Sequence, residues 1–229
     1  MGELHSDDVK PDLRFELLRR AERDQAARGK GEPDWESVVA VDAENLAWLM
    51  RVVAEVGWPG RSMVGEDGAH AAWLLAQHAD RDPAFQRRCL DLLTEATDRD
   101  EASSAELAYL TDRVLLAESQ PQEYGTQFTG REGRWAPRRL RDPENLDERR
   151  AAMSLGPLAD NIARLDEAYG PPRPGSVPCA KCGGTVEVWL PDEGEERKVN
   201  CPACGWTATL RVGAPARATR RPDGPLAGH

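Results

Sequence analysis

The stretch "EDGAHAAWLLAQHAD", residues 66–80, decides the fold of the larger part of the chain. It is apolar on nearly every side, and a helix without a polar face is stable only when other helices surround it. The pattern therefore predicts a central helix over about residues 66–79, with Trp73 and Leu74 largely buried. We expect residues 1–168 to form an all-α domain around this helix.

Segments on both sides repeat apolar residues with helical spacing, which predicts five to seven helices in this domain. Start and stop signals support the assignment: an aspartate before a first-turn proline, a serine and a glutamate three positions apart, and Gly-Pro or Gly-x-Pro stops. The expected helices cover about residues 11–29, 42–56, 66–79, 83–96, 103–118 and a broken region, 146–168.

Four cysteines near the C-terminus have the spacing of a zinc site. Cys179-x2-Cys182 and Cys201-x2-Cys204 can bring four thiolates together around one Zn²⁺, and a glycine follows each pair, where a knuckle turn needs positive φ. With three β-rich runs that predict a three-stranded sheet, residues 177–212 resemble the zinc-ribbon family. Free or disulfide-linked cysteines in a loop are the alternative.

A complete four-cysteine shell leaves no open coordination position, so we expect one structural Zn²⁺ per chain and no catalytic metal. The stretch "YGPPRPGSVP" is rich in proline and glycine and predicts a linker over residues 169–178. The ribbon is then expected over 179–212 and a disordered tail over 213–229.

Charge and hydropathy restrict the partners. The net charge is −10, and acidic side chains outnumber basic ones in residues 1–170, which counts against binding of nucleic acid by the helical domain. No apolar run is long enough to span a membrane, and the N-terminus lacks the basic and apolar parts of a secretory signal. Paired cysteines then predict a cytoplasmic protein. The ribbon has nearly balanced charge, so it is expected to contact protein or only to stabilise the chain.

Several polar residues stand in apolar surroundings and are candidates for a site. Gln77 and His78 end the apolar helix, whose negative pole favours a protonated histidine, and Asp80 is close enough in sequence to pair with His78. Asp112 lies in an apolar arc and needs a partner. Arg113 is expected on the solvent side with Glu106. Asp24, Gln25 and Arg28 belong to a highly charged helix, where solvation explains them.

The loop "QEYGTQF", residues 122–128, supplies a second group of polar residues. Gly125 allows a turn or a close approach to a ligand, while Tyr124, Thr126 and Gln127 offer neutral donors and acceptors. The loop is therefore predicted to form the floor of a pocket for a small polar ligand, beside His78 and Asp112. Its alternative role is structural, with the tyrosine filling a helix junction.

The pieces "DQAAR", "DAENLAWL", "AQHADRDPAFQ", "AYLTDRV" and "QEYGTQ" give the chain a resemblance to an uncharacterised bacterial family of unknown function over about residues 12–165. The family carries no established activity. The resemblance implies a recurring polar set: Asp24, Gln25, Arg28, Asn45, Gln77, His78, Asp80, Asp112, Arg113, Tyr124, Gly125, Thr126 and Gln127.

Two functions are compatible with these residues. In an enzyme acting on a small polar or amino-acid-like substrate, His78 is the acid–base group, Asp112 its orienting partner and Tyr124 a further catalytic residue. The expected ligand contacts are Gln77, Asp80, Arg113, Gly125, Thr126 and Gln127. In a non-enzymatic interaction or regulatory module, the same residues are structural.

A third hypothesis is a metal centre of His70, His78, Asp80 and Asp112. Two helical turns, about 12 Å, separate the histidines, which weakens this hypothesis.

Overall fold

The computed structural model describes residues 10–29, 34–189, 191 and 196–211. The chain divides into two compact units, residues 1–117 and 118–229, and each is described by itself. The predicted tail, residues 213–229, lies outside the described residues. The sequence-based domain boundaries stay predictions.

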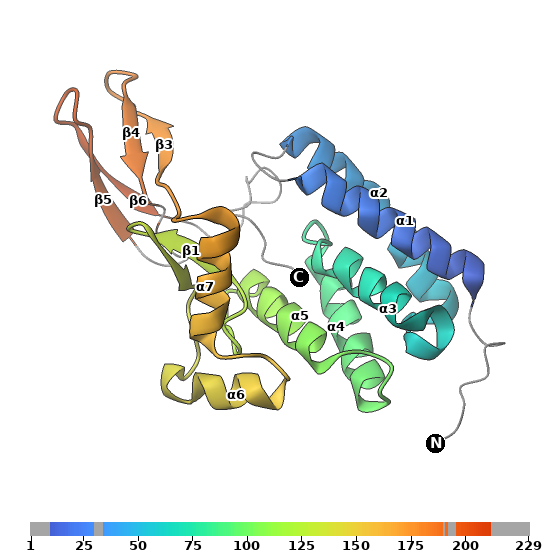
Figure 1. The fold of residues 1–229 in the computed structure, drawn as a ribbon. Helices are drawn as coiled ribbons and strands as arrows, with labels where there is room; N and C mark the ends of the chain where they lie inside the picture. Colours follow the sequence, from blue (N-terminus) through green and yellow to red (C-terminus); the bar gives the residue numbers. More distant parts are fainter. Residues whose placement is uncertain (1–9, 30–33, 190, 192–195, 212–229) are drawn as a thin grey trace. The chain divides into compact units, whose positions relative to one another are not determined.

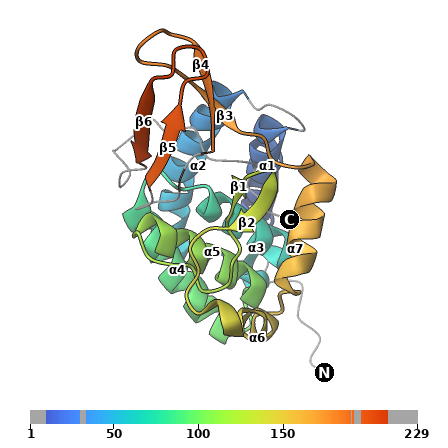
Figure 2. The ribbon, with the colours of Figure 1, turned by 90° about the vertical axis from the view of Figure 1, so that its left-hand side faces the viewer.

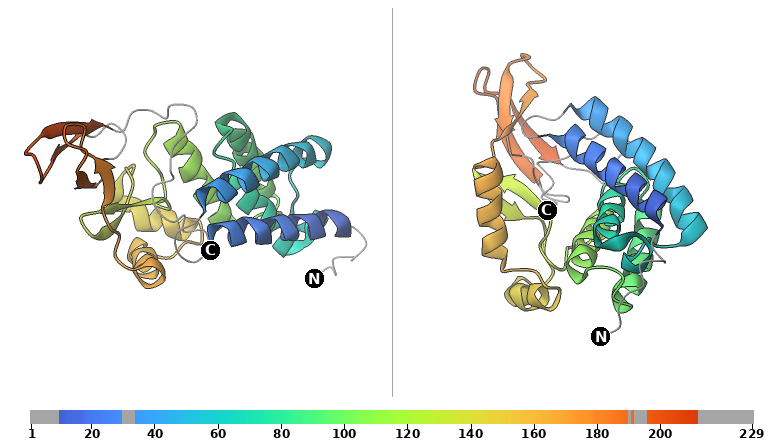
Figure 3. Two further views of the ribbon diagram at one scale, coloured as in Figure 1. Left: turned by 90° about the horizontal axis from the view of Figure 1, so that it is seen from above. Right: turned by 45° about the vertical axis from the view of Figure 1, so that its right-hand side comes forward.

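The first unit is a bundle of five helices (Figure 1): α1 Pro11–Arg28, α2 Trp35–Val56, α3 Arg61–Gln77, α4 Pro83–Asp98 and α5 Ser104–Ala117. α1 lies alongside α2 (Figure 3) and also packs against α3, while α4 packs mainly on α5. None of the helices in the described residues is long and apolar enough to cross a membrane.

α3 is the central helix that the sequence predicts. Trp73 is 2% and Leu74 4% exposed, which confirms their predicted burial. Gly65 has φ 75° and ψ 169°, so the regular helix restarts just after it, at the predicted position. Only glycine adopts this backbone conformation without strain, and the kink therefore has a local cause.

Capping explains where neighbouring helices begin. The Asp82 carboxylate accepts a hydrogen bond from the Phe85 N–H at 3.0 Å, as the Asp-Pro signal predicts. α2 begins seven residues earlier than expected, at Trp35, because Asp34 caps it and the next turn buries Val38 and Val41. The Asp34 cap and these two valines precede the stretch from which the helix was predicted, so the sequence did not reveal this earlier start.

The second unit begins with a β-hairpin that the all-α prediction did not include. β1 Phe128–Arg131 pairs antiparallel with β2 Arg134–Pro137. Glu132 and Gly133, the two residues between them, both have positive φ (49° and 80°), as a two-residue hairpin turn requires. The surrounding arginines gave this stretch the composition of a loop and concealed the turn.

A short 3₁₀ helix (Pro143–Asn145), α6 (Leu146–Ala152) and α7 (Leu158–Tyr169) follow. α7 packs against β2 (Figure 2), where the Trp135 indole N–H donates to the Gly170 carbonyl at 2.9 Å. The described residues thus contain seven α-helices, five in the first unit and two in the second.

The described residues of the cysteine region contain four strands: β3 Gly175–Pro178, β4 Thr185–Val188, β5 Glu196–Asn200 and β6 Thr207–Arg211. They form two separate antiparallel pairs, β3 with β4 and β5 with β6, so the prediction of one three-stranded sheet is wrong. Each Cys-x2-Cys turn closes its own hairpin, and β3 lies in the proline-rich stretch that obscured it.

Candidate functional site

The four paired cysteines come together in the second unit. The Sγ atoms of Cys179 and Cys204 are 3.7 Å apart, as are those of Cys182 and Cys201, and all four lie within 4.8 Å of one another. Four thiolates bonded to a tetrahedral Zn²⁺ at about 2.3 Å are separated by about 3.8 Å. The cluster is therefore close enough to hold one metal ion.

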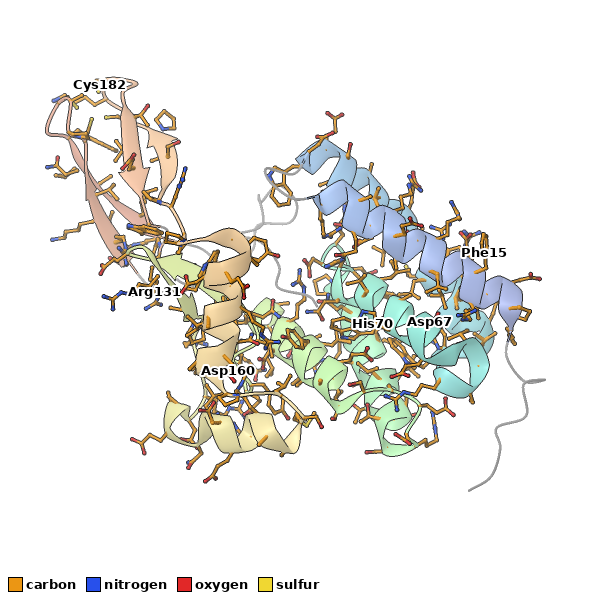
Figure 4. The ribbon with its side chains drawn as sticks, viewed as in Figure 1. Phe15, Asp67, His70, Arg131, Asp160 and Cys182 are labelled. Atoms are coloured by element: carbon orange, nitrogen blue, oxygen red, sulfur yellow. The ribbon has the colours of Figure 1, made fainter. Side chains whose placement is uncertain are left out.

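Two equivalent turns build this cluster. In the first, the Gly183 N–H donates to the Cys179 carbonyl at 2.8 Å, and in the second, the Gly205 N–H donates to the Cys201 carbonyl at 2.9 Å. Both glycines have positive φ (73° and 68°), which confirms the role expected of them. Cys182, labelled in Figure 4, is exposed, while Cys179 and Cys201 are buried.

In the first unit, the polar centre is a pair between α1 and the end of α3. The two carboxylate oxygens of Asp24 lie 3.0 and 2.9 Å from His78 Nδ1. Asp24 is fully buried and His78 is 5% exposed. The carboxylate partner of His78 is thus Asp24, not Asp80 as the sequence proximity indicated, because α1 packs against α3 and Asp24 lies on the buried side of α1.

Arg28 extends this pair to α2. Its guanidinium donates to Asp24 at 2.8 Å and to both oxygens of Asp42 at 2.9 and 3.1 Å. The expectation that solvation explains Asp24, Gln25 and Arg28 is therefore wrong for Asp24. Burial raises the pKa of Asp24, but the hydrogen bond of His78 and the charge of Arg28 outweigh it and lower the pKa overall. For Asp42, burial prevails over Arg28 and raises the pKa.

Asp80 belongs to a neighbouring pair. It accepts from Arg113 Nε at 2.8 Å and from Gln86 Nε2 at 3.2 Å. Arg113 is only 9% exposed, so its predicted place on the solvent side with Glu106 is wrong. Asp112 is fully buried, in agreement with its apolar arc.

Glu106 instead pairs with the other histidine of α3. His70 Nδ1 lies 2.7 Å from Glu106 Oε1, and this hydrogen bond raises the pKa of His70. Both line an open cleft of about 810 Å³, together with Asp67, which Figure 4 labels beside His70. The hypothetical metal centre is therefore not assembled around His70 and Asp80. The first-unit residues with closely spaced ligand atoms are Asp24, Asp42 and His78.

The Tyr-Gly-Thr-Gln loop is fixed by hydrogen bonds of Gln122, a residue that the sequence did not single out. The Gln122 side chain is fully buried, donates to the Gln127 and Arg138 carbonyls at 3.0 and 2.9 Å, and accepts from the Gln127 N–H at 3.0 Å. Gly125 has φ 63°, and an added Cβ would lie 3.2 Å from Leu140.

Arg150 fixes the same loop from α6. It is fully buried and donates to the carbonyls of Tyr124 and Gly156, at 2.7 Å in each case. Its position in "DERRAA" indicated only a charged helix surface, so nothing in the local sequence could reveal its burial. Thr126 is 2% exposed, and Gly125 beside it is also buried.

A comparison with known protein families covers most of these elements. A family model described as a family of unknown function, DUF6624, matches residues 11–172. The chain belongs to DUF6624. The DUF6624 match includes the whole of α1 to α7 and stops before Cys179, so the cysteine cluster lies outside it. Searches of curated proteins and of solved structures found no match.

Proposed function

We propose that His78 is the acid–base group of a site that binds or transforms a small polar or amino-acid-like ligand, and that Asp24 orients it. The buried hydrogen bond between His78 Nδ1 and the Asp24 carboxylate carries this proposal. A carboxylate at Nδ1 favours the tautomer with the proton on that nitrogen and leaves Nε2 as the base. Within the described part of the chain, both side-chain hydrogen bonds of His78 use Nδ1.

Other residues have proposed roles in binding. Gln77, Asp80 and Arg113 are proposed ligand contacts, and Asp112 is proposed as an electrostatic group now that Asp24 occupies the orienting position. The contribution of Tyr124, Gly125, Thr126 and Gln127 to the same pocket stays a prediction from the sequence.

For the cysteine cluster, we propose one structural Zn²⁺ per chain. Support comes from the thiolate donor set and from Sγ separations close to those of a tetrahedral zinc site. We further propose that the ribbon contacts a protein partner and that the chain works in the cytoplasm, where thiolates stay reduced.

The proposal for His78 is tested on the full-length, zinc-loaded protein by a thermal-shift screen of small polar metabolites. His78→Gln and Asp24→Asn should abolish the ligand-induced shift that the unmodified protein shows. His70→Gln is the matched control, because it removes another carboxylate-bonded histidine from the same helix.

A non-enzymatic module predicts a different result. Neither His78→Gln nor Asp24→Asn would then change the response to any ligand in the screen, however much each lowers the melting temperature. That result would assign the Asp24–His78 pair a purely structural role.

A further inference from the structure

Two buried amide oxygens, one at the end of α3 and one on α4, have no hydrogen-bond donor in the part of the chain that the structure describes. Gln77 Oε1 and Gln86 Oε1 have no hydrogen-bond partner among the described residues, although Gln77 is 4% and Gln86 1% exposed. Buried acceptors in native proteins almost always receive a hydrogen bond, and one that does not destabilises the fold. Such atoms therefore indicate where a missing donor belongs.

The contacts of Gln86 determine which end of its amide is the oxygen. Gln86 Nε2 donates to the Ala76 and Gln77 carbonyls at 3.1 and 3.2 Å and to Asp80 Oδ1 at 3.2 Å. Three acceptors around one atom identify it as the nitrogen of the amide, so the oxygen assignment does not depend on an arbitrary flip. Oε1 is bonded to the same carbon as this nitrogen, whose acceptors include the Asp80 carboxylate.

The charges nearby have the same preference for a donor. Three carboxylates lie here: Asp24 and Asp42 share Arg28, Asp24 is also bonded to His78, and Asp80 pairs with Arg113. α3 also ends at Gln77, where the negative pole of its dipole favours positive charge. The unpaired acceptors and the helix end both favour a cationic group that donates several hydrogen bonds.

We infer that the ligand of this site is an amine or amidine whose protonated nitrogen donates to Gln77 and Gln86. The inference rests on the proposed function, because it names the substrate class of the site around His78. Asn45 Nδ2, one turn after Asp42 on α2, is a buried donor without a partner among the described residues. It would accommodate a carbonyl or hydroxyl oxygen elsewhere on the same amine.

The test measures binding to full-length, zinc-loaded protein by thermal shift and calorimetry. Agmatine, ethanolamine and lysine are compared with glutarate and inorganic phosphate. We expect the amines to raise the melting temperature and to bind, and the two anions to do neither.

Gln77→Met gives the sharper result, because it keeps the size of the side chain and removes the unpaired acceptor. We expect it to raise the melting temperature of the ligand-free protein and to weaken amine binding at least tenfold. Gln77→Glu, which keeps the acceptor and adds negative charge, should tighten amine binding. Gln120→Met is the control at an exposed glutamine and should change neither quantity.

Each other outcome overturns the inference in a distinguishable way. If Gln77→Met stabilises the protein and leaves amine binding unchanged, water satisfies the acceptor and the amine assignment is wrong. If glutarate or phosphate binds in place of the amines and His78→Gln abolishes that binding, the ligand class is wrong while the proposed function stands. If no compound of either class binds and the metabolite screen shows no His78-dependent ligand, both proposals are wrong.

Discussion

Asp24 and His78 are 54 positions apart, yet both oxygens of the Asp24 carboxylate lie within 3.0 Å of His78 Nδ1. The pair joins the last turn of α1 to the end of the central helix, and Arg28 continues it to Asp42 on α2. Three helices thus share one buried ionic network. Removing one member of such a network leaves the others charged and without compensation in a poorly hydrated place.

Asp24→Asn should therefore lower the free energy of unfolding by about 3–5 kcal/mol, as for other broken buried ion pairs. The measurement is urea unfolding of the zinc-loaded protein at neutral pH. Asp67→Asn is the control: it breaks the pair between Arg14 and Asp67, whose side chains are 45% and 48% exposed, and should change stability by less than about 1 kcal/mol. Equal effects of the two substitutions would contradict the network.

The same carboxyl group predicts a pH dependence. The folded protein lowers the pKa of Asp24 below its ordinary value, so its ionised form stabilises the fold above the unfolded pKa of about 4. That contribution is lost as the pH falls through the lower folded pKa. Unfolding measured from pH 7 to pH 3 should show a steeper loss of stability for the unmodified protein than for Asp24→Asn. Parallel curves would show that the Asp24 pKa is not lowered.

Cys89 should behave differently from the other four cysteines. It is fully buried on α4, and burial raises the pKa of its thiol to about 12, so almost no reactive thiolate forms at neutral pH. Ellman's reagent should find no fast thiol in the zinc-loaded protein, four after zinc is chelated and the fifth only in denaturant. Modification of Cys89 in the folded, zinc-loaded chain would contradict its burial.

The cysteine cluster and the central helix could be predicted because their signals are local. Cys-x2-Cys spacing and an all-apolar helix each specify a structure without reference to distant residues. The partners of His78 and Arg113 could not be predicted in this way. Asp24 and Asp80 are equally acidic in the sequence, and only the packing of α1 on α3 determines which of them reaches the histidine.

The Tyr-Gly-Thr-Gln loop shows the same limit of prediction from the sequence. Gln122 and Arg150 have polar side chains that the sequence places in a loop and on a charged helix, yet both are fully buried. Their hydrogen bonds go to backbone carbonyls, which every residue has, so no side-chain motif identifies the partners.

Zinc content gives a direct test of the cluster. The purified protein should contain about one zinc per chain, and Cys201→Ser should lose it, since a three-thiolate site binds zinc far more weakly. Helical circular dichroism should remain nearly unchanged, because all α-helices of the described residues lie outside the four cysteine-region strands. A large loss of helical signal would show that the ribbon and the helices unfold together.

The last prediction concerns Gly130 on β1, the described glycine of the second unit at which an added Cβ would lie closest to a neighbouring atom. A Cβ at this position would lie 2.6 Å from the Pro172 Cβ and 3.1 Å from the Trp189 ring. The proline ring cannot rotate away, so Gly130→Ala must displace the backbone and should destabilise the second unit by about 1–3 kcal/mol.

Gly156→Ala is the matched control for this substitution, because its nearest neighbour would be 3.8 Å from the new Cβ. It should leave stability nearly unchanged. The measurement is urea unfolding followed by tryptophan fluorescence, to which Trp135 and Trp189 of the unit under test contribute along with the tryptophans of the first unit. If both substitutions change the unfolding midpoint equally, or neither does, then Gly130 is not required for the contact between β1 and the segment of Pro172.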